Sequence, residues 1–573
     1  MQSSSCLAAA LAILATFPLA AVESATPVLV PAYQSGLLLE SLGPIAGNPT
    51  QMAWGPDGRL YVRTETGVLS YAFDHQTGAI SDQRQAVTGF DGTGLAFHGS
   101  HLYLTTYDGA IRRLGDDDGD GIWGEPGELN VAIVTSIPVG SWAGDHQVDQ
   151  LAISGDTLFV GIGQRTNNGR TGPWTIGTLS DDPDDSGFWI NGGTGWSWGE
   201  VAIGGTISWI RNLNAVPDVE GAANTYADSS TITQNLAQVD DSPIDPSILG
   251  AVDKLVVHSA GTRNPFGLCL SPAGSLWFTN NYNRADTNGD GTAGYYLLDA
   301  TQPDFARSVQ DQLFLAVENG DYGFANDNWR PLNPMLDPAS VTYNRVPSTT
   351  FDNLFNSGPY VLHDPANPDG LGPNSAPAGC GFLDTTALPA DLRGRIFVTR
   401  WTHSVTEATA DGDPIQQTLT YADLVAVDPE TGGVVRVAHD FEHPVAVLAD
   451  GTQRLLVADY PRGAIGGRLF AIALDADVDA IADSADNCQA VANPTQCDSD
   501  GDGFGNHCDG DLNNNGYTNA FDTPLYRAQL GQPSVGPTYN IADLNCNGSV
   551  NAFDTPIFRS LLGSPPGPSA LAP

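Results

Sequence analysis

Two stretches near the carboxyl end carry oxygen-bearing side chains at the spacing of a calcium loop. Counted from Asp511 or Asp543, each has Asp or Asn at positions 1, 3, 5, 9 and 12, and glycine at position 6. The residue at position 7 can offer its carbonyl oxygen. The candidate ligands are Asp511, Asn513, Asn515, Tyr517, Asn519 and Asp522, and then Asp543, Asn545, Asn547, Ser549, Asn551 and Asp554. A hard cation takes about six to eight oxygens, so the repeat predicts two calcium sites, with turns that bind nothing as the alternative.

Alternating aspartates occur in two further runs upstream of these loops and in one much earlier stretch. The two runs are Asp475, Asp477 and Asp479, joined by Asp483 and Asp486, and Asp498, Asp500 and Asp502, joined by Asp509 and Asp511. The earlier stretch, "DDDGDGIWGEPGE", offers Asp116, Asp118 and Asp120, with Glu125 or Glu128 beside them. All three predict divalent cations. A disordered acidic linker is the alternative for the two runs. A further stretch, with Asp286, Asn288 and Asp290, is explained equally well by a calcium loop and by a solvated turn.

His146, Arg263 and Asn264 offer a different chemistry, and they stand just before two apolar, strand-like stretches. A histidine that titrates near neutral pH can accept a proton from a hydroxyl group, and an arginine can stabilise the negative charge that develops. If both stretches are inner strands of one ring, their starts converge on one pocket. A structural histidine and an arginine that braces a turn are the alternatives.

The elements that must position these residues are mostly strands. One phrase recurs near residues 51, 93, 148, 266, 378 and 445: a short apolar run, a tight turn and a second run rich in Leu, Tyr, Phe and Val. Each phrase predicts an antiparallel strand pair. Six pairs predict an all-β fold, a six-bladed β-propeller over residues 40–474, with a β-sandwich or a β-helix as the alternatives. The widest gaps, near 165–250 and 280–375, are expected to be loops on one rim.

Helices are expected only in the carboxyl-terminal tail. After each calcium loop, "TPLYRAQLG" and "TPIFRSLLG" place proline near the start and glycine at the end, which predicts one short helix each. The upstream segment, residues 475–510, has almost no apolar side chains, so metal and disulfide bonds must order it. Residues 564–573 are expected to be disordered.

Composition and charge limit where this chain works and what it binds. Its first 25 residues have an apolar centre too short to span a bilayer, followed by small residues, which predicts a secretory signal. No later stretch is apolar enough to cross a membrane. The net charge of −43, with 23 basic residues, argues against nucleic acid and anionic membranes as partners. We therefore expect an exported protein, extracellular, periplasmic or surface-held, in which Cys269 and Cys380 either pair or are simply buried.

Two parts of the tail resemble known calcium modules. Residues 511–563 resemble a dockerin-type pair, in which calcium-loop-plus-helix units lack the entering helix of an EF-hand. This implies a protein partner for the tail, although "TP" at both helix starts means that cohesin itself is not implied. Residues 475–510, with "DNC" and "NPTQ", resemble thrombospondin type 3 repeats. That resemblance implies calcium and a Cys488–Cys508 disulfide, which leaves Cys497 for Cys546.

The middle of the chain resembles the soluble quinoprotein glucose/sorbosone dehydrogenases. The family motif H-x-x-G-x-L is met by "HQVDQL" without its glycine, and G-x-R-N-P-x-G-L is met in full by "GTRNPFGL". The resemblance implies a six-bladed propeller that binds pyrroloquinoline quinone (PQQ) and calcium and oxidises a sugar. It implies His146 as the base and Arg263 and Asn264 as quinone contacts, with Arg400 or Arg462 as the cation for the quinone carboxylates. A non-catalytic adhesion or glycan-binding propeller is the alternative function.

Overall fold

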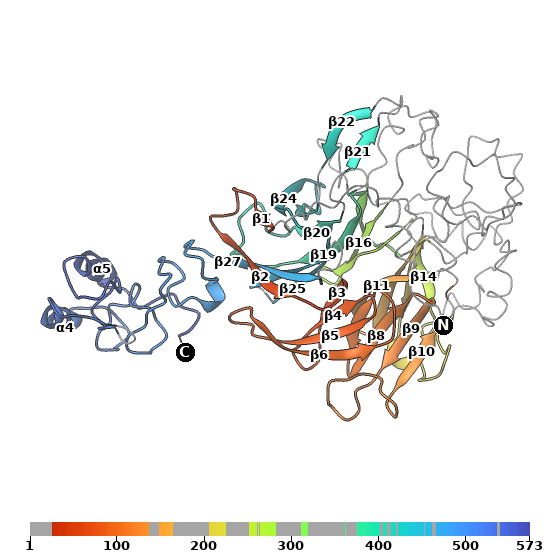
Figure 1. The fold of residues 1–573 in the computed structure, drawn as a ribbon, viewed down its shortest axis with the longest axis horizontal. Coiled ribbons are helices and arrows are strands. Elements are labelled where there is room, and N and C mark those ends of the chain that lie inside the picture. Colours follow the sequence, from red (N-terminus) through yellow and green to blue (C-terminus); the bar gives the residue numbers. More distant parts are fainter. Residues whose placement is uncertain are drawn as a thin grey trace, which may run out of the picture.

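The computed structural model consists of a ring of sheets and a small tail. It describes residues 26–135, 137, 148–163, 205–224, 251–260, 262, 264–281, 311–318, 361–362, 375–401, 405–408, 414–419, 422–451, 453–460, 466–535 and 539–572. Figure 1 shows the sheets together, with the tail projecting from the side of the ring where β2 (Leu37–Pro44) and β27 (Arg468–Leu474) lie. The signal expected over residues 1–25 lies outside the described residues.

The first three blades are four-stranded antiparallel sheets. Blade 1 contains β3 (Pro49–Trp54), β4 (Leu60–Thr64), β5 (Gly67–Phe73) and β6 (Ile80–Thr88). Blade 2 contains β7 (Leu95–His98), β8 (His101–Thr106), β9 (Ala110–Leu114) and β10 (Asn130–Val134). Blade 3 contains β11 (Val148–Ser154), β12 (Thr157–Ile162), β13 (Thr206–Ile210) and β14 (Val256–Ala260).

The other three blades complete the ring. Blade 4 contains β15 (Leu268–Leu270), β16 (Leu276–Asn280), β17 (Gln312–Leu315) and β18 (Val361–Leu362). Blade 5 contains β19 (Pro377–Phe382), β20 (Ile396–Arg400), β23 (Asp423–Val427) and β24 (Val434–His439), with β1 (Val28–Leu29) added at its outer edge. Blade 6 contains β25 (Pro444–Asp450), β26 (Arg454–Asp459), β27 and β2. A separate hairpin pairs β21 (Val405–Ala408) with β22 (Pro414–Leu419).

This arrangement confirms the six-bladed β-propeller predicted from the sequence. The six recurring phrases are the first two strands of the six blades, and each inner strand contacts the next, with β25 meeting β3 to complete the circle. The ring is closed by β2, which pairs antiparallel with β27. The expected start at residue 40 is therefore wrong, because it falls inside β2. The gaps expected to be loops also contain β13, β17 and β18.

The apolar core of the ring is divided into six layers, one between each pair of neighbouring blades. A strand that packs against a blade on each side buries both of its faces, and β4 and β23 bury all five of their residues. The Cys269–Cys380 disulfide joins β15 to β19 and so links blades 4 and 5 covalently. The sequence had left open whether these two cysteines pair.

Two buried glutamines link inner strands around the axis. Gln51 on β3 bonds the backbone of β7 and β11, and Gln150 on β11 bonds the backbone of β3 and β15, at 2.7 to 3.3 Å. Blades 1 and 4 lie opposite each other in a ring of six, so Gln150 reaches across the axis. A ligand site on the axis is therefore expected at a rim of the ring and not at its centre.

The tail is held together by a very small core and two disulfides. Its helices, α4 (Asp522–Gln529) and α5 (Asp554–Leu561), confirm the two predicted helices, and the Tyr526 and Phe558 rings stack at 4.5 Å. The disulfides join Cys488 to Cys508 and Cys497 to Cys546, as the resemblance implied. The second disulfide ties the 475–510 segment to the second calcium loop, so the two predicted modules form one unit.

The expectation that residues 564–573 are disordered is wrong for residues 564–572. Gly567 N donates to Cys508 O, Ala570 N donates to Asp486 O, and Pro568 O accepts from Gln489 N, at 2.9 to 3.2 Å. These backbone bonds return the last residues to the aspartate-rich segment. In the part of the chain that the structure describes, no helix has the length and hydropathy of a membrane span.

Gly267 tests how closely the inner strands approach one another. A Cβ at this position would lie 1.8 Å from Ala378 O of the next blade. We expect Gly267→Ala to lower the free energy of unfolding by about 1–3 kcal/mol or more, because the backbone must move to relieve the overlap. Gly36→Ala is the matched control, since its Cβ would meet its nearest atom at 3.9 Å. Denaturant unfolding of both variants measures the effect, and equal stability of the two would contradict the strand packing described here.

Candidate metal centres and the propeller rim

The first residue of each calcium loop is a buried aspartate around which the backbone turns. Asp511 accepts hydrogen bonds from the amides of Asn515 and Gly516. Asp543 accepts from the corresponding amides of Asn547 and Gly548 at 3.2 and 3.0 Å. The glycine at position 6 has φ 94° in the first loop and 97° in the second, a conformation that glycine adopts without strain.

The last residue of each loop is the first residue of the following helix, and it closes the loop. Asp522 Oδ1 accepts from Asn513 Nδ2 at 2.6 Å, and its Oδ2 accepts from Asn519 N at 2.7 Å. Asp554 Oδ1 accepts from the backbone N of Asn545 at 3.1 Å, where the first loop uses a side-chain amide, and Asp554 Oδ2 accepts from Asn551 N at 2.7 Å. Positions 1, 3, 5, 9 and 12 are thus linked by hydrogen bonds within each loop.

One amide in each loop lies among the predicted oxygen ligands. Asn519 Nδ2 donates to Asn515 Oδ1 at 3.0 Å and to Tyr517 O at 2.7 Å. Asn551 Nδ2 makes the matching bonds to Asn547 Oδ1 and Ser549 O. The oxygens of positions 5 and 7 therefore point at one place, which is occupied by the partial positive charge of the Asn519 or Asn551 amide group. A rotation of the Asn519 or Asn551 amide by 180° would add its own oxygen to that set.

The charge balance of the tail fits calcium. The carboxylates of Asp511, Asp522, Asp543 and Asp554 are at most 1% exposed. Residues 475–573 contain thirteen aspartates and two arginines, and within the described part of this segment no basic side chain pairs with an aspartate. A buried carboxylate without a cationic partner is costly. Clustered carboxylate, amide and carbonyl oxygens are the ligands that calcium prefers.

The first aspartate run converges at the junction between propeller and tail. Ligand oxygens of Asp475, Asp477 and Asp479 lie within 4.8 Å of one another. Both Asp477 oxygens are buried and have no hydrogen-bond partner in the described part of the chain. Burial, followed by the neighbouring carboxylates, raises the pKa of Asp477 to about 6. Asp486 is fully buried, and its Oδ2 has no partner among the described residues either.

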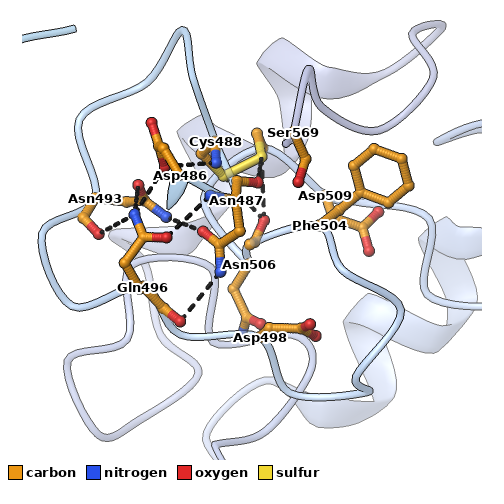
Figure 2. The surroundings of a disulfide bond; sticks show 12 residues. Asp486, Asn487, Cys488, Asn493, Gln496, Asp498, Phe504, Asn506, Asp509 and Ser569 are labelled. Atoms are coloured by element: carbon orange, nitrogen blue, oxygen red, sulfur yellow. Dashed lines mark hydrogen bonds between the residues drawn. A yellow bond between two sulfur atoms is a disulfide. The ribbon is translucent and has the colours of Figure 1, made fainter. Parts of the chain in front are cut away.

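The second aspartate run forms another centre. Ligand oxygens of Asp498, Asp500 and Asp502 also lie within 4.8 Å of one another. Asp509 belongs to the same surroundings, because burial and then the nearby carboxylates raise its pKa to about 7. Figure 2 shows Asp486 to one side of the Cys488–Cys508 disulfide and Asp509 to the other. Both aspartates therefore lie beside this disulfide, on different sides of it in this view.

The propeller carries one centre of the same kind in blade 2. Asp116, Asp118 and Glu128 bring ligand oxygens within 4.8 Å of one another. Asp120, which the sequence also predicted, is outside this group, and its Oδ1 accepts from Ile122 N at 2.8 Å. Glu128 takes the place expected of it or of Glu125. Asp286, Asn288 and Asp290 lie outside the described residues.

The inner strands start at one rim of the ring, where the sequence predicted proton chemistry. We call this end, with the ends of β4, β8, β12, β16, β20 and β26, the funnel rim. His146, Arg263 and Arg462 lie outside the described residues. Asn264 is described: it bridges Asn281 beside the end of β16, and its buried Oδ1 has no hydrogen-bond partner in the described part of the chain. An unsatisfied amide oxygen at this rim suits a contact to a bound ligand.

Arg400 does not offer a free cation to a ligand, contrary to the role considered for it. Its Nε and NH2 donate to the two oxygens of Asp423 at 2.7 and 2.6 Å. Asp423 is fully buried and also accepts from Arg436 Nε at 2.7 Å. The two residues face each other in register on β20 and β23. The guanidinium fork that was expected to hold a cofactor carboxylate holds a carboxylate of the protein itself.

The funnel rim also carries aromatic and polar residues that sequence reasoning missed. Tyr460 Oη donates to Glu65 Oε1 at 2.5 Å, and Asn48 Nδ2 donates to Glu65 Oε2 at 2.7 Å. The Trp401 ring lies 4.8 Å from Tyr460 and stacks on His443 at 4.6 Å. Trp401 and Tyr460 directly follow β20 and β26, so an aromatic residue just after the second strand of a blade was the available signal.

Asp149 is a further residue that the sequence reasoning missed. It stands on β11 at the place of the glycine in the motif H-x-x-G-x-L. Its side chain is buried, and Oδ2 has no hydrogen-bond partner among the described residues. Burial raises the pKa of Asp149 well above its usual range. Burial also raises the pKa of Tyr107, and the charges of Glu65 and Asp149 contribute to that shift. Acidic groups from blades 1, 2 and 3 thus lie near one another at this rim.

Comparison with known proteins gives structural neighbours of low similarity. No protein-family model matches the chain, and no curated protein matches it. A calcium structure of a Trichoderma reesei enzyme of carbohydrate-active family AA12 is 15% identical, covers 80% of this chain and 99% of its own, and has a TM-score of 0.46. The holo PQQ domain of Coprinopsis cinerea pyranose dehydrogenase is 12% identical, covers 78% and 97%, and has a TM-score of 0.44. At these values the fold rests on the sheets described above, and no function is taken from the neighbours.

The calcium loops give a direct binding prediction. We expect Asp511→Asn to weaken calcium binding at the first loop by about tenfold or more, because ligand charge sets affinity in such loops over several decades. The matched control is Asp156→Asn, which removes a half-exposed carboxylate on blade 3. Isothermal titration of the chelated, full-length chain measures both variants. Unchanged binding in Asp511→Asn would contradict the site.

The buried Arg400–Asp423 pair gives a stability prediction. We expect Asp423→Asn to cost about 3–5 kcal/mol, because it leaves the buried Arg400 guanidinium facing a neutral amide. Asp82→Asn is the control: Asp82 is half exposed and also contacts two arginines, so its loss should cost about 1 kcal/mol or less. Guanidinium unfolding in calcium buffer measures the difference. Equal stability of the two variants would show that Arg400 does not depend on Asp423.

Proposed function

We propose that this chain is an exported calcium-binding protein whose propeller binds a sugar at the funnel rim and oxidises it with PQQ. The observation that carries the calcium part is the burial of Asp511, Asp522, Asp543 and Asp554 without a basic partner in the described part of the chain. Three disulfides support an oxidising compartment, where thiols stay paired. Exposed Phe521 and Phe553, one before each helix, offer apolar contacts for a protein partner of the tail.

The sugar part of the proposal is supported by the composition of the funnel rim. Trp401 and Tyr460 present aromatic rings, and Glu65 and Asn48 present groups that can exchange hydrogen bonds with hydroxyls. Small-molecule binding sites usually combine apolar walls with a few polar groups that fix the orientation of the ligand. The motif "GTRNPFGL", which begins just before β15, adds the resemblance to sugar dehydrogenases.

In the proposed reaction the protein orients a sugar hydroxyl and moves its proton. His146 takes the hydroxyl proton as the base, and Arg263 stabilises the negative charge that develops on the oxygen. Asn264 holds the ligand through its amide. PQQ, when bound, would accept the hydride from the sugar carbon that carries this hydroxyl. Of the described residues, Asn264 fits a quinone contact and Arg400 does not, so Arg462 remains the proposed cation for the quinone carboxylates.

A non-catalytic, glycan-binding propeller is the second candidate function. It is favoured by two observations at the same rim: the closed Arg400–Asp423 pair and the acidic Asp149 at the glycine position of the motif. In this reading the same aromatic and polar residues bind a glycan without redox chemistry. The calcium-binding tail would then be a rigid module that docks the propeller to a partner.

Reconstitution distinguishes the two functions. The full-length chain is loaded with calcium and PQQ, and dye reduction is followed with a panel of aldoses. We expect reduction that falls by about 100-fold or more in His146→Ala, because general base catalysis supplies about that factor. Quinone binding, followed by absorbance, should survive in this variant. His439→Ala, which changes a histidine of the outer strand β24, is the control and should keep full activity.

The outcomes separate cleanly. Glycan binding without quinone binding would establish the second function and overturn the first. Binding of neither a quinone nor a sugar by the calcium-loaded chain would overturn both. A loss of activity in His439→Ala equal to that in His146→Ala would remove the assignment of the base.

A further inference from the structure

The ring of the propeller is closed next to a cluster of carboxylates. The closing strand β2 pairs with β27, in a register that sets Leu37 opposite Leu474. The next residue, Asp475, continues this pairing, because its backbone amide donates to Gly36 O at 3.2 Å. Asp475 is also the first member of the aspartate group of the propeller–tail junction. One residue therefore belongs both to the closure of the ring and to a candidate metal centre.

A buried arginine joins three parts of the molecule at the same place. Arg454, on β26, is fully buried, and its NH1 donates to Asp450 Oδ2 at 3.2 Å within blade 6. The same guanidinium donates to the backbone oxygens of His75 and Gln76, which lie between β5 and β6 of blade 1. It also donates to Ser484 Oγ of the tail. A single side chain thus holds blade 6, blade 1 and the tail together.

Ser484 connects this arginine to the aspartate cluster. It lies in the short helix η6 (Asp483–Ala485), and its Oγ donates to Gln76 O at 2.7 Å. Its neighbour Asp483 accepts from Ala476 N at 2.8 Å. Ala476 lies between Asp475 and Asp477, so the loop that would surround a cation is also bonded to the helix that contacts blade 1.

Within the described part of the chain, no basic side chain pairs with an aspartate of this cluster. Both oxygens of Asp477 and Oδ2 of the fully buried Asp486 have no hydrogen-bond partner in the described part of the chain. Glu40, on the closing strand β2, has a buried Oε2 that is likewise without a partner among the described residues. Negative groups from the tail and from β2 therefore face the junction, and a divalent cation would balance them.

We propose that a divalent cation bound by Asp475, Asp477 and Asp479 locks the propeller ring by fixing the tail across the joint between blades 6 and 1. With the cation, the loop holds η6 and Ser484 against blade 1, and Asp475 keeps β2 paired with β27. Without it, repulsion between the carboxylates loosens the loop, and β2 frays. No disulfide of the described part of the chain crosses this joint, so its closure depends on these bonds. The inference rests on the calcium-binding part of the proposed function.

Hydrogen exchange of the full-length chain tests the lock. In saturating calcium we expect the amides of β2 and β27 to be protected, and in chelator to exchange about tenfold faster or more. The amides of β12 in blade 3 are the internal reference and should change little. This comparison of one protein in two buffers needs no variant, and unchanged exchange of β2 and β27 in chelator would overturn the lock even if a variant fails to fold.

A matched pair of variants assigns the effect to this cation. Asp477→Asn and Asp500→Asn remove the middle aspartate of the first and the second run, and only the first run borders the propeller. Each variant should lose bound calcium by equilibrium dialysis, but only Asp477→Asn should speed exchange in β2 and β27. Ser484→Ala should keep its calcium. It should still reduce the difference in the exchange rate of β2 and β27 between calcium and chelator.

The results distinguish a failed lock from a failed metal site. If Asp477→Asn kept all of its calcium, the metal assignment would fall and the lock with it. If Asp477→Asn lost calcium while β2 and β27 stayed fully protected, calcium binding would stand and the lock would be overturned. Equal acceleration of β2 exchange by Asp500→Asn would also overturn it, because the effect would then belong to the whole tail.

Discussion

The structure depends most on how it neutralises carboxylates that folding removes from water. In the propeller two of the buried carboxylates have arginine partners: Asp423 has Arg400 and Arg436, and Asp450 has Arg454. In the tail the described aspartates have no such partners, and the segment has too few apolar side chains to compensate for the burial. Under the proposed function, divalent cations from the solvent take in the tail the place that arginines take beside Asp423 and Asp450.

This division explains why the tail is built as it is. Backbone amides at fixed spacing bind both oxygens of the first aspartate of each loop, Asp511 and Asp543, and so fix its carboxylate in place. Two disulfides reduce the conformational entropy of the unfolded chain in a tail whose apolar core is very small. Under the proposed function, the tail is a stiff arm whose order depends on bound calcium, attached where the ring of blades is closed.

Local sequence patterns predicted what is local. The spacing of residues in the sequence predicted the six strand pairs, the two helices and the convergence of the loop ligands. Each of these features depends on residues within one hairpin, one helix or one loop. The closing strand β2 was cut at residue 40 because its partner β27 lies at the other end of the propeller. Arg400 was assigned to a ligand because nothing local reveals that Asp423 faces it across the sheet. Residues 564–572 have a loop-like composition, and they are ordered by bonds to distant residues, among them Asp486 and Cys508.

The most direct measurement of the central claim is an anomalous difference map from crystals of the full-length chain grown with calcium. The account predicts peaks enclosed by Asp511 and Asp522, by Asp543 and Asp554, and by Asp475, Asp477 and Asp479. Each peak should lie about 2.3–2.6 Å from several oxygens. A map without peaks, in which those buried carboxylates are satisfied by amides alone, would contradict it.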